Sequence, residues 1–242
     1  MDTLRTHFEP FGPKDTKTSP HSNSRPIRIL MLHGHGQSGR FFYHKSRPVV
    51  ESLHKMALEG ASERCPAGIE LFYPNGPHCA SEATETDTWT WGQGDFESEV
   101  IIRGLDASIK KIMEILTKHG PFDGVMGFST GATIAAIITS ILERSDGIEK
   151  IQHPPFRFAV CFSGFRLQHP SYRRFYSPRI QTPVLHFVAT YDTMVPGALT
   201  DKLVEACSEC DVRVFEGTHC VPRRREQVVS ASNFVMQRLG CA

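Results

Sequence analysis

Short apolar runs alternate with longer segments of mixed polarity along most of this chain. Six of the runs have the length and composition of buried strands in a parallel sheet. They are Ile27–Leu32, Ile69–Tyr73, Phe122–Phe128, Phe158–Phe162, Val184–Val188 and Val212–Phe215. Parallel strands are apolar throughout because helices cover both faces of such a sheet. The runs therefore predict a mostly parallel sheet of about six strands.

The segments between the runs predict helices. Their approximate bounds are Arg47–Gly60, Glu97–His119, Thr130–Glu143, Gly197–Cys207 and Arg223–Leu239. The second segment repeats apolar side chains at helical spacing from Val100 to Leu116, and we expect Gly120 and Pro121 to end it. Alternating strands and helices of this length predict an α/β fold with helices on both faces of the sheet.

Length and polarity indicate one domain. The 242 residues suffice for a single α/β domain with a full core, and we assign it to residues 26–242. Residues 1–25 are polar, lack the apolar stretch of a signal peptide, and predict a flexible N-terminal arm. The chain has no run of about 18 apolar residues, so we expect a cytoplasmic protein without a membrane span.

Charge and cysteine content narrow the function classes. The chain has 27 Lys and Arg residues against 26 Asp and Glu residues, so its net charge does not favour nucleic acid as a partner. Its seven cysteines, an odd number, argue against a disulfide scaffold and for a reducing compartment. Cys207 and Cys210 have no second pair nearby, and we interpret them as the end of a helix rather than a zinc or redox site.

The run Gly127–Gly131 fits the pattern Gly-x-Ser-x-Gly and lies between a predicted strand and a predicted helix. In that context the serine occupies a tight strand-to-helix turn, which lifts its hydroxyl above the edge of the sheet. Glycine suits the flanking positions because the backbone is strained there and neighbouring elements pass close. Ser129 is therefore the predicted nucleophile.

A serine nucleophile needs an adjacent base, and the base needs an acid that orients it. Asp192 follows the predicted strand Val184–Val188, and His219 follows the predicted strand Val212–Phe215. Taken alone, Asp192 fits a helix N-cap and His219 fits a surface histidine. The order serine, aspartate, histidine, each just past a strand, favours a catalytic triad of Ser129, Asp192 and His219.

The oxyanion of the tetrahedral intermediate needs backbone donors. One predicted donor is the N–H of Thr130, the residue after the nucleophile. The other is the N–H of His35, with Gly36 or Gln37 as the alternative, because the glycines of this loop allow a close approach of the backbone. The same glycines also suit a tight turn into the helix. His33 and His35 lack a further ligand at metal spacing, so we expect neither a metal nor a cofactor.

At these positions the chain resembles the FSH family of serine hydrolases, a branch of the α/β hydrolases. The resemblance covers about Ile27 to Leu239 and is carried by the segments Leu32–Gly39, Gly120–Ala132, Ser163–Phe165 and Gly217–Pro222. Family members often have glutamine after the nucleophile, where this chain has Thr130, a change that leaves the backbone donor in place. The resemblance implies a single-domain α/β-hydrolase fold.

The resembling family includes esterases of broad metabolic role and thioesterases that release finished polyketides from fungal synthases, such as the one in the lovastatin pathway. By this resemblance we expect a serine hydrolase that cleaves an acyl thioester or ester through an acyl-enzyme. Release of a polyketide or similar acyl chain from a carrier is the finer expectation. The alternatives are a carboxylesterase acting on oxygen esters of small metabolites and a binding protein that kept the fold without catalysis.

Two loops, residues 74–96 and 165–182, are expected to shape the acyl pocket. Trp89, Trp91 and Phe165 are the predicted substrate contacts, because aromatic side chains near an active site suit an apolar acyl chain. The alternative is that the tryptophans only anchor a long loop.

Arginines gather in two places near the predicted site. They are Arg166, Arg173, Arg174 and Arg179 in the second loop, and Arg223–Arg225 soon after His219. Cations at the N-terminus of a helix oppose its macrodipole. One hypothesis is that these arginines receive the acidic acyl-carrier domain of a polyketide synthase or its phosphopantetheine phosphate. The alternative is a solvated basic face.

Overall fold

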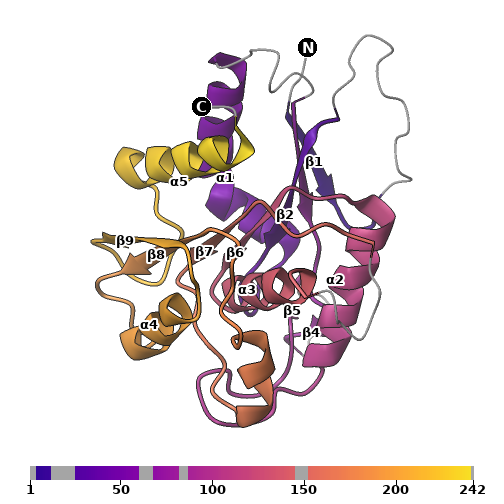
Figure 1. The fold of residues 1–242 in the computed structure, drawn as a ribbon, viewed down its shortest axis with the longest axis vertical. Helices are drawn as coiled ribbons and strands as arrows, with labels where there is room; N and C mark the ends of the chain where they lie inside the picture. The colour runs from indigo at the N-terminus through magenta and orange to yellow at the C-terminus, as the bar shows by residue number, and fades with distance from the viewer. Residues whose placement is uncertain (1–3, 12–24, 60–67, 82–86, 145–151, 241–242) are drawn as a thin grey trace.

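A seven-stranded parallel sheet forms the centre of the molecule (Figure 1). The computed structural model describes residues 4–11, 25–59, 68–81, 87–144 and 152–240. The strands follow the order β1 (Leu4–Phe8), β3 (Ile69–Tyr73), β2 (Ile27–Leu32), β6 (Gly124–Phe128), β7 (Phe158–Phe162), β8 (Val184–Ala189) and β9 (Cys210–Phe215), and every neighbouring pair is parallel. A separate antiparallel pair joins β4 (His78–Cys79) to β5 (Trp89–Thr90).

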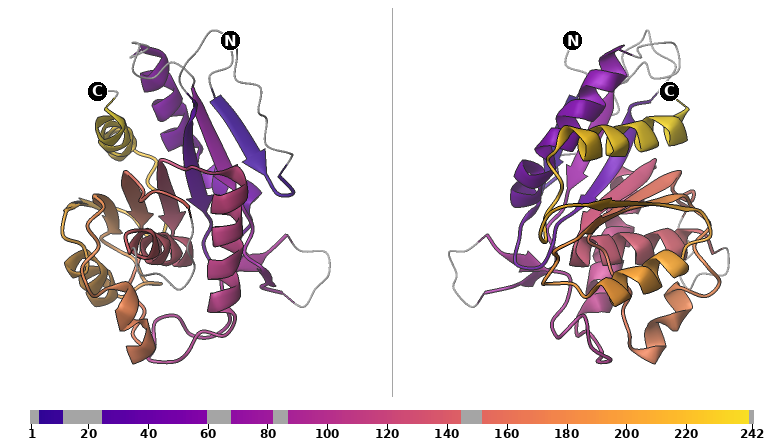
Figure 2. Two further views of the ribbon diagram at one scale, coloured as in Figure 1. Left: turned by 45° about the vertical axis from the view of Figure 1, so that its right-hand side comes forward. Right: turned by 90° about the vertical axis from the view of Figure 1, so that its left-hand side faces the viewer.

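Helices cover both faces of this sheet, as Figure 2 shows. On one face α1 (Gly39–Glu59) packs against α5 (Arg225–Leu239), and on the other lie α2 (Leu105–His119), α3 (Thr130–Leu142) and α4 (Gly197–Glu205). Each face has its own cluster of buried apolar side chains, so the sheet separates two cores. The prediction of an α/β fold with a mostly parallel sheet and helices on both faces is confirmed.

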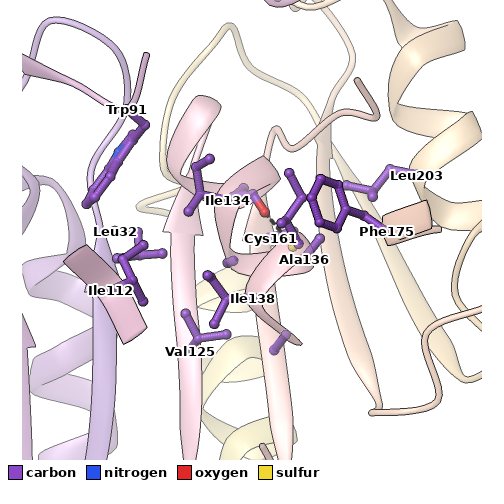
Figure 3. Close-up of a cluster of buried hydrophobic side chains, with 14 of the residues drawn as sticks. Leu32, Trp91, Ile112, Val125, Ile134, Ala136, Ile138, Cys161, Phe175 and Leu203 are labelled. Carbon is purple, nitrogen blue, oxygen red and sulfur yellow. Dashed lines mark hydrogen bonds between the residues drawn. The ribbon is translucent and has the colours of Figure 1, made fainter. Parts of the chain in front are cut away.

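The central elements are buried because they are covered on all sides. Every residue of β6 and β7 is buried. The helix α3 is buried from Thr130 to Ser140, which explains why its sequence is apolar all round instead of along one stripe. Figure 3 shows Ile134 and Ile138 of this helix next to Val125 of β6 and Cys161 of β7.

The N-terminal segment departs from the prediction of a flexible arm over residues 1–25. That prediction is wrong for Leu4–Phe8, which forms the edge strand β1 and pairs with β3 from Leu4 opposite Ile69 to Phe8 opposite Tyr73. Leu4 and Phe8 also pack against the core under α1 and α5. The sequence does not indicate this strand, because an edge strand is only partly buried and needs no continuous apolar run. Residues 12–24 lie outside the described residues.

Two helices begin at other residues than the sequence predicts. The segment from Glu97 to Gly104 is not part of α2, which begins at Leu105 after Gly104 with a φ of 77°. Val100 and Ile101, which match helical spacing, are 45% and 61% exposed in an irregular loop. The helix α1 begins at Gly39, well before the predicted start. None of the described helices has the length and apolar character needed to cross a membrane.

The parallel register brings the carboxyl ends of β2, β6, β8 and β9 to one edge of the sheet. The loop of His33–Gln37 follows β2, Ser129 follows β6, Asp192 follows β8 and His219 follows β9. Segments far apart in the chain therefore meet at this edge, where ligand sites of open α/β sheets lie.

Candidate active site

Ser129 lies at a sharp turn between β6 and α3. Its backbone has a φ of 55° and a ψ of −124°, and residues other than glycine seldom have a positive φ. The Ser129 N–H donates to the carbonyl oxygen of Phe162, at the end of β7, over 2.9 Å. A backbone of this kind costs about 1–3 kcal/mol and persists where the surrounding structure imposes it. This is the geometry predicted for the serine of Gly-x-Ser-x-Gly.

The loop after β2 packs directly against this turn. A Cβ atom on Gly34 would lie 2.9 Å from Cδ1 of Phe128 and 3.3 Å from Cβ of Ser129. A Cβ atom on Gly131 would overlap the carbonyl oxygen of His33. The absence of side chains at these two glycines thus lets the loop and the serine turn approach each other.

The two segments that meet at Ser129 carry the two predicted backbone donors, the N–H groups of Thr130 and His35. The N–H of Thr130 opens α3, and a helix leaves its first N–H groups without partners inside the helix. His35 follows Gly34, and Nδ1 of its exposed imidazole lies 2.9 Å from Oγ1 of Thr90. The structure therefore places Thr130 and His35 where the sequence suggests, and their role as oxyanion donors stays a prediction.

Asp192 and His219 form a hydrogen-bonded pair. His219 Nδ1 lies 2.8 Å from Oδ2 of Asp192. The other carboxylate oxygen, Oδ1, accepts the backbone N–H groups of Met194 and Val195 at 3.0 and 2.9 Å. Burial raises the pKa of Asp192, but the hydrogen bonds from His219, Val195 and Met194 outweigh burial and hold the pKa below its ordinary value. Asp192 is therefore ionised at neutral pH, and His219 donates from Nδ1.

The pair lies beside the serine turn. The ring of His219 packs against Phe128, the residue before Ser129, with 4.8 Å between the ring centres. Because Asp192 engages Nδ1, Nε2 is the ring nitrogen left to take a proton from a serine. The structure thus brings the three predicted triad residues together at one edge of the sheet.

His33 supports the loop after β2 from inside the protein. It is fully buried, its Nδ1 donates to the carbonyl oxygen of Gly34 at 2.7 Å, and its Nε2 accepts the N–H of Gly76 at 2.9 Å. Burial lowers the pKa of His33 to about 4, so the ring is neutral. The two hydrogen bonds of the His33 ring hold the loop in shape, which explains why a histidine occupies this position.

Two of the three predicted substrate contacts belong to the core. Trp91 is fully buried, and its indole N–H donates to the carbonyl oxygen of His33 at 2.7 Å. Figure 3 shows Trp91 close to Leu32, in the same apolar cluster as Phe165, which is 2% exposed. Neither side chain presents a surface to a substrate, so the predicted contacts of Trp91 and Phe165 are corrected. The physical reason is that burial of a large aromatic ring is favourable, and both rings pack into the core instead of facing the site.

Trp89 lies beside the loop that carries His35. Its backbone N–H donates to the carbonyl oxygen of Gln37 at 2.9 Å, and its indole N–H donates to Oδ1 of Asp87 at 2.9 Å. The side chain is half-buried. A substrate contact of Trp89 therefore stays a prediction that this position allows.

Sequence reasoning does not single out two residues that contact the site. In the sequence, Phe128 is only a variable position of the Gly-x-Ser-x-Gly motif. In the structure, its ring packs against the ring of His219. The ammonium nitrogen of Lys45, in α1, lies 4.4 Å from the centre of the same ring. The alternation of side chains along a strand could indicate that Phe128 faces one layer of helices. Lys45 gives no such signal, because its position depends on how α1 crosses the sheet.

The parallel sheet covered by helices, the tight turn of Ser129 and the Asp192–His219 pair at the same edge are the architecture of the α/β-hydrolase class. A family model described as "Serine hydrolase (FSH1)" matches residues 22–231, and the chain belongs to this family.

Individual proteins show the same relationship. A Schizosaccharomyces pombe protein named dihydrofolate reductase is 34% identical over 219 residues, which are 83% of this chain and 45% of that protein. The chain spans about half the length of the first curated relatives that it matches. Esterase OVCA2 of Danio rerio is 29% identical over 223 residues, 81% of this chain and 91% of that protein. The crystal structure of Arabidopsis thaliana SOBER1 has a TM-score of 0.61 at 18% identity and covers 89% of this chain and 100% of that one, which shows a shared fold.

Proposed function

We propose that this protein hydrolyses an acyl thioester or ester through an acyl-enzyme on Ser129. The observation that carries the proposal is the hydrogen bond of 2.8 Å between His219 Nδ1 and Asp192 Oδ2, formed next to the strained turn of Ser129. An imidazole held in this way by Nδ1 turns Nε2 toward its other side, where it is positioned as a general base.

In the proposed reaction Ser129 attacks the carbonyl carbon while its proton passes to Nε2 of His219. Asp192 stabilises the resulting imidazolium. When the C–S or C–O bond breaks, His219 returns the proton to the leaving thiol or alcohol, and the acyl group stays on Ser129 as an ester. Water then gives a proton to His219 and attacks this ester. The acid leaves, and Ser129 recovers its proton without any cofactor.

The oxyanion of both tetrahedral intermediates is assigned to the N–H groups of Thr130 and His35. Support comes from the contact of Gly34 with Ser129, which brings the His35 segment to the serine turn. Removal of one such donor reduces kcat by about 10²- to 10³-fold in other hydrolases.

For the substrate we favour a thioester whose acyl chain is a polyketide or a similar secondary metabolite, released from the carrier domain of a synthase. Support comes from the motif segments that resemble such thioesterases and from the cations Arg223–Arg225 just after His219, which suit the phosphate of a phosphopantetheine arm. The described cysteines are free thiols, which fits a reducing compartment such as the cytoplasm.

A carboxylesterase acting on oxygen esters of small metabolites is the second candidate. It is favoured by the name of the Danio rerio relative, an esterase. A pantetheine thioester and the oxygen ester with the same acyl chain and the same alcohol skeleton separate the two candidates. A higher kcat/KM for the thioester supports the thioesterase, and a higher kcat/KM for the oxygen ester replaces it with the carboxylesterase.

A fluorophosphonate probe tests whether the protein is a hydrolase at all, because it phosphonylates an activated serine. We expect the wild type to be labelled and Ser129→Ala to remain unlabelled. Ser163→Ala is the matched control and should keep the label, because Ser163 also follows a strand of the sheet and also has a positive φ, 50°. A folded wild type without label would indicate a binding protein that kept the fold without catalysis.

A further inference from the structure

A cavity of about 320 Å³ opens between α1 and the start of α5. Its walls come from α1, from the residues on either side of Thr218 and His219, and from the start of α5. The charged side chains in these walls are Lys45, Glu216, Arg223 and Arg224. The cavity therefore adjoins the turn that carries His219, and three of its four charged side chains are cations.

The charges in these walls do not balance. Arg224 and Glu216 pair with each other at 3.4 Å, and both are exposed. Among the residues that the structure describes, Lys45 and Arg223 have no carboxylate in ion-pair contact. Burial lowers the pKa of Lys45, Cys220 opposes this effect, and the positive charge of Arg223 adds to it. A half-buried ammonium beside an arginine, with no counter-charge, is stabilised by a bound anion.

The start of α5 adds to the imbalance. Arg224 is the N-cap residue of this helix, and Arg223 precedes it. The positive end of a helix dipole disfavours cations at this position and favours anions. An anion between Lys45 and the start of α5 would therefore be stabilised by the side chains of Lys45 and Arg223 and by the dipole of the helix.

One aromatic ring connects the cavity to the triad. The Lys45 ammonium nitrogen lies 4.4 Å from the centre of the Phe128 ring, and the centre of the His219 ring lies 4.8 Å from the same point. Both distances are measured from the centre of the Phe128 ring. The Lys45 ammonium nitrogen therefore cannot be farther from the centre of the His219 ring than the sum of the two.

We propose that this cavity binds an anionic group of the substrate, a carboxylate or a phosphate, that lies a few bonds from the scissile carbonyl. The inference rests on the proposed function and deepens it, because it names negatively charged acyl thioesters or esters as the substrate class. The apolar part of the wall, with Phe215, Val221 and Pro222, suits the carbon chain next to the anion. Lys45 and Arg223 are then specificity-determining residues.

Matched substrate pairs test the proposal. One pair differs in a terminal carboxylate on a short acyl chain, and the other differs in a phosphate on a short leaving group, a phosphorylated alcohol or thiol of a few carbons against its unphosphorylated form. We expect wild-type kcat/KM to be about tenfold higher for the charged member of one pair, as for a charge-assisted contact. This preference should shrink as ionic strength rises. The pair that shows it identifies the anion as a carboxylate or a phosphate.

Variants of the two cations locate the effect. Lys45→Met removes the charge at similar length and should bring the ratio of kcat/KM for the charged and uncharged members close to one. Lys45→Arg keeps the charge and should keep most of the preference. Lys55→Gln removes an exposed cation from the same helix and should keep the preference. The unfolding midpoint of each variant verifies folding. If Lys45→Met does not fold, the exposed Arg223→Gln decides in the same way.

Two results are distinguishable. Equal kcat/KM within both pairs for an active wild type, or a preference that survives the loss of the Lys45 charge, would overturn this inference and leave the hydrolase proposal standing. A folded wild type that hydrolyses no member of either pair would overturn the proposed function, and the inference with it.

Discussion

The indole N–H of Trp91 donates a hydrogen bond of 2.7 Å to the carbonyl oxygen of His33, at the start of the loop that packs against Ser129. Both residues are fully buried, and 4.8 Å separates their ring centres. Trp91 therefore holds the loop that carries His35. We infer that it influences the oxyanion site from the core, without contact with the substrate.

Trp91→Phe tests this positioning role. The variant keeps an aromatic ring in the core but leaves the His33 carbonyl without its donor, which costs about 1–3 kcal/mol of stability. We expect kcat to fall while KM changes little, since the displaced loop weakens binding of the transition state. Kinetics with acyl chains of several lengths provide the measurement. Trp89→Phe, which removes an indole N–H bonded to exposed Asp87, is the control with a smaller expected effect on kcat. A rise in KM for long chains at constant kcat would instead make Trp91 a substrate contact.

Asp192→Asn tests the orientation of His219. The amide still accepts the N–H groups of Met194 and Val195 on one oxygen, but it neither fixes the tautomer of His219 nor stabilises the imidazolium. We expect kcat to fall by about 10³- to 10⁴-fold at nearly unchanged stability. Asp201→Asn, exposed on α4, should behave as wild type. A loss below about tenfold would show that His219 works without Asp192.

Gly34→Ala tests the contact between the loop and the serine turn. The added methyl group would lie 2.9 Å from Cδ1 of Phe128 and 3.3 Å from Cβ of Ser129, so the loop must move. We expect a loss of about 1–3 kcal/mol of stability and a loss of activity of about 10²-fold. Gly197→Ala, where a Cβ atom meets nothing within 4 Å, is the matched control. Unchanged activity in Gly34→Ala would separate this loop from catalysis.

The free energy of unfolding should decrease as the pH is lowered, because two histidines are buried in the neutral form. Burial lowers the pKa of His33 to about 4 and that of His186 to about 4, from 6.5. Between these values the unfolded chain binds protons that the folded protein does not, so this stability is complete above pH 6.5 and is lost as the pH falls to about 4. At about 1.4 kcal/mol per pKa unit, each histidine contributes about 3 kcal/mol.

Denaturant unfolding at several pH values measures this dependence. His186→Leu removes one of the two histidines and should make stability less dependent on pH between 6.5 and 4. The same slope in wild type and His186→Leu would show that His186 takes up its proton in the folded protein as easily as in the unfolded chain.

The strands of the sheet could be predicted because each buried parallel strand is a continuous apolar run. β2, β3 and β7 have the predicted bounds. β1 could not be predicted in this way, because Leu4–Phe8 is an edge strand and includes polar residues. The false start of a helix at Glu97 has another cause. Val100 and Ile101 match helical spacing, but the spacing does not show that these side chains are exposed.

Chain order was sufficient for the triad positions, because the topology of parallel strands forces Ser129, Asp192 and His219 to one edge. The roles of Trp91 and Lys45 could not be predicted. Whether an aromatic ring in a loop faces the core or the solvent depends on the packing of that loop. The distance from Lys45 to the Phe128 ring depends on the position of α1 over the sheet.

The most direct test of the proposed function is mass spectrometry of the acyl-enzyme. The wild type is mixed briefly with an acyl-pantetheine thioester, quenched in acid and digested. We predict the mass of the acyl group on the peptide that contains Ser129, and its absence in Ser129→Ala together with loss of hydrolysis. Hydrolysis that persists in Ser129→Ala, or hydrolysis by the wild type through an acyl group on another residue, would contradict Ser129 as the nucleophile.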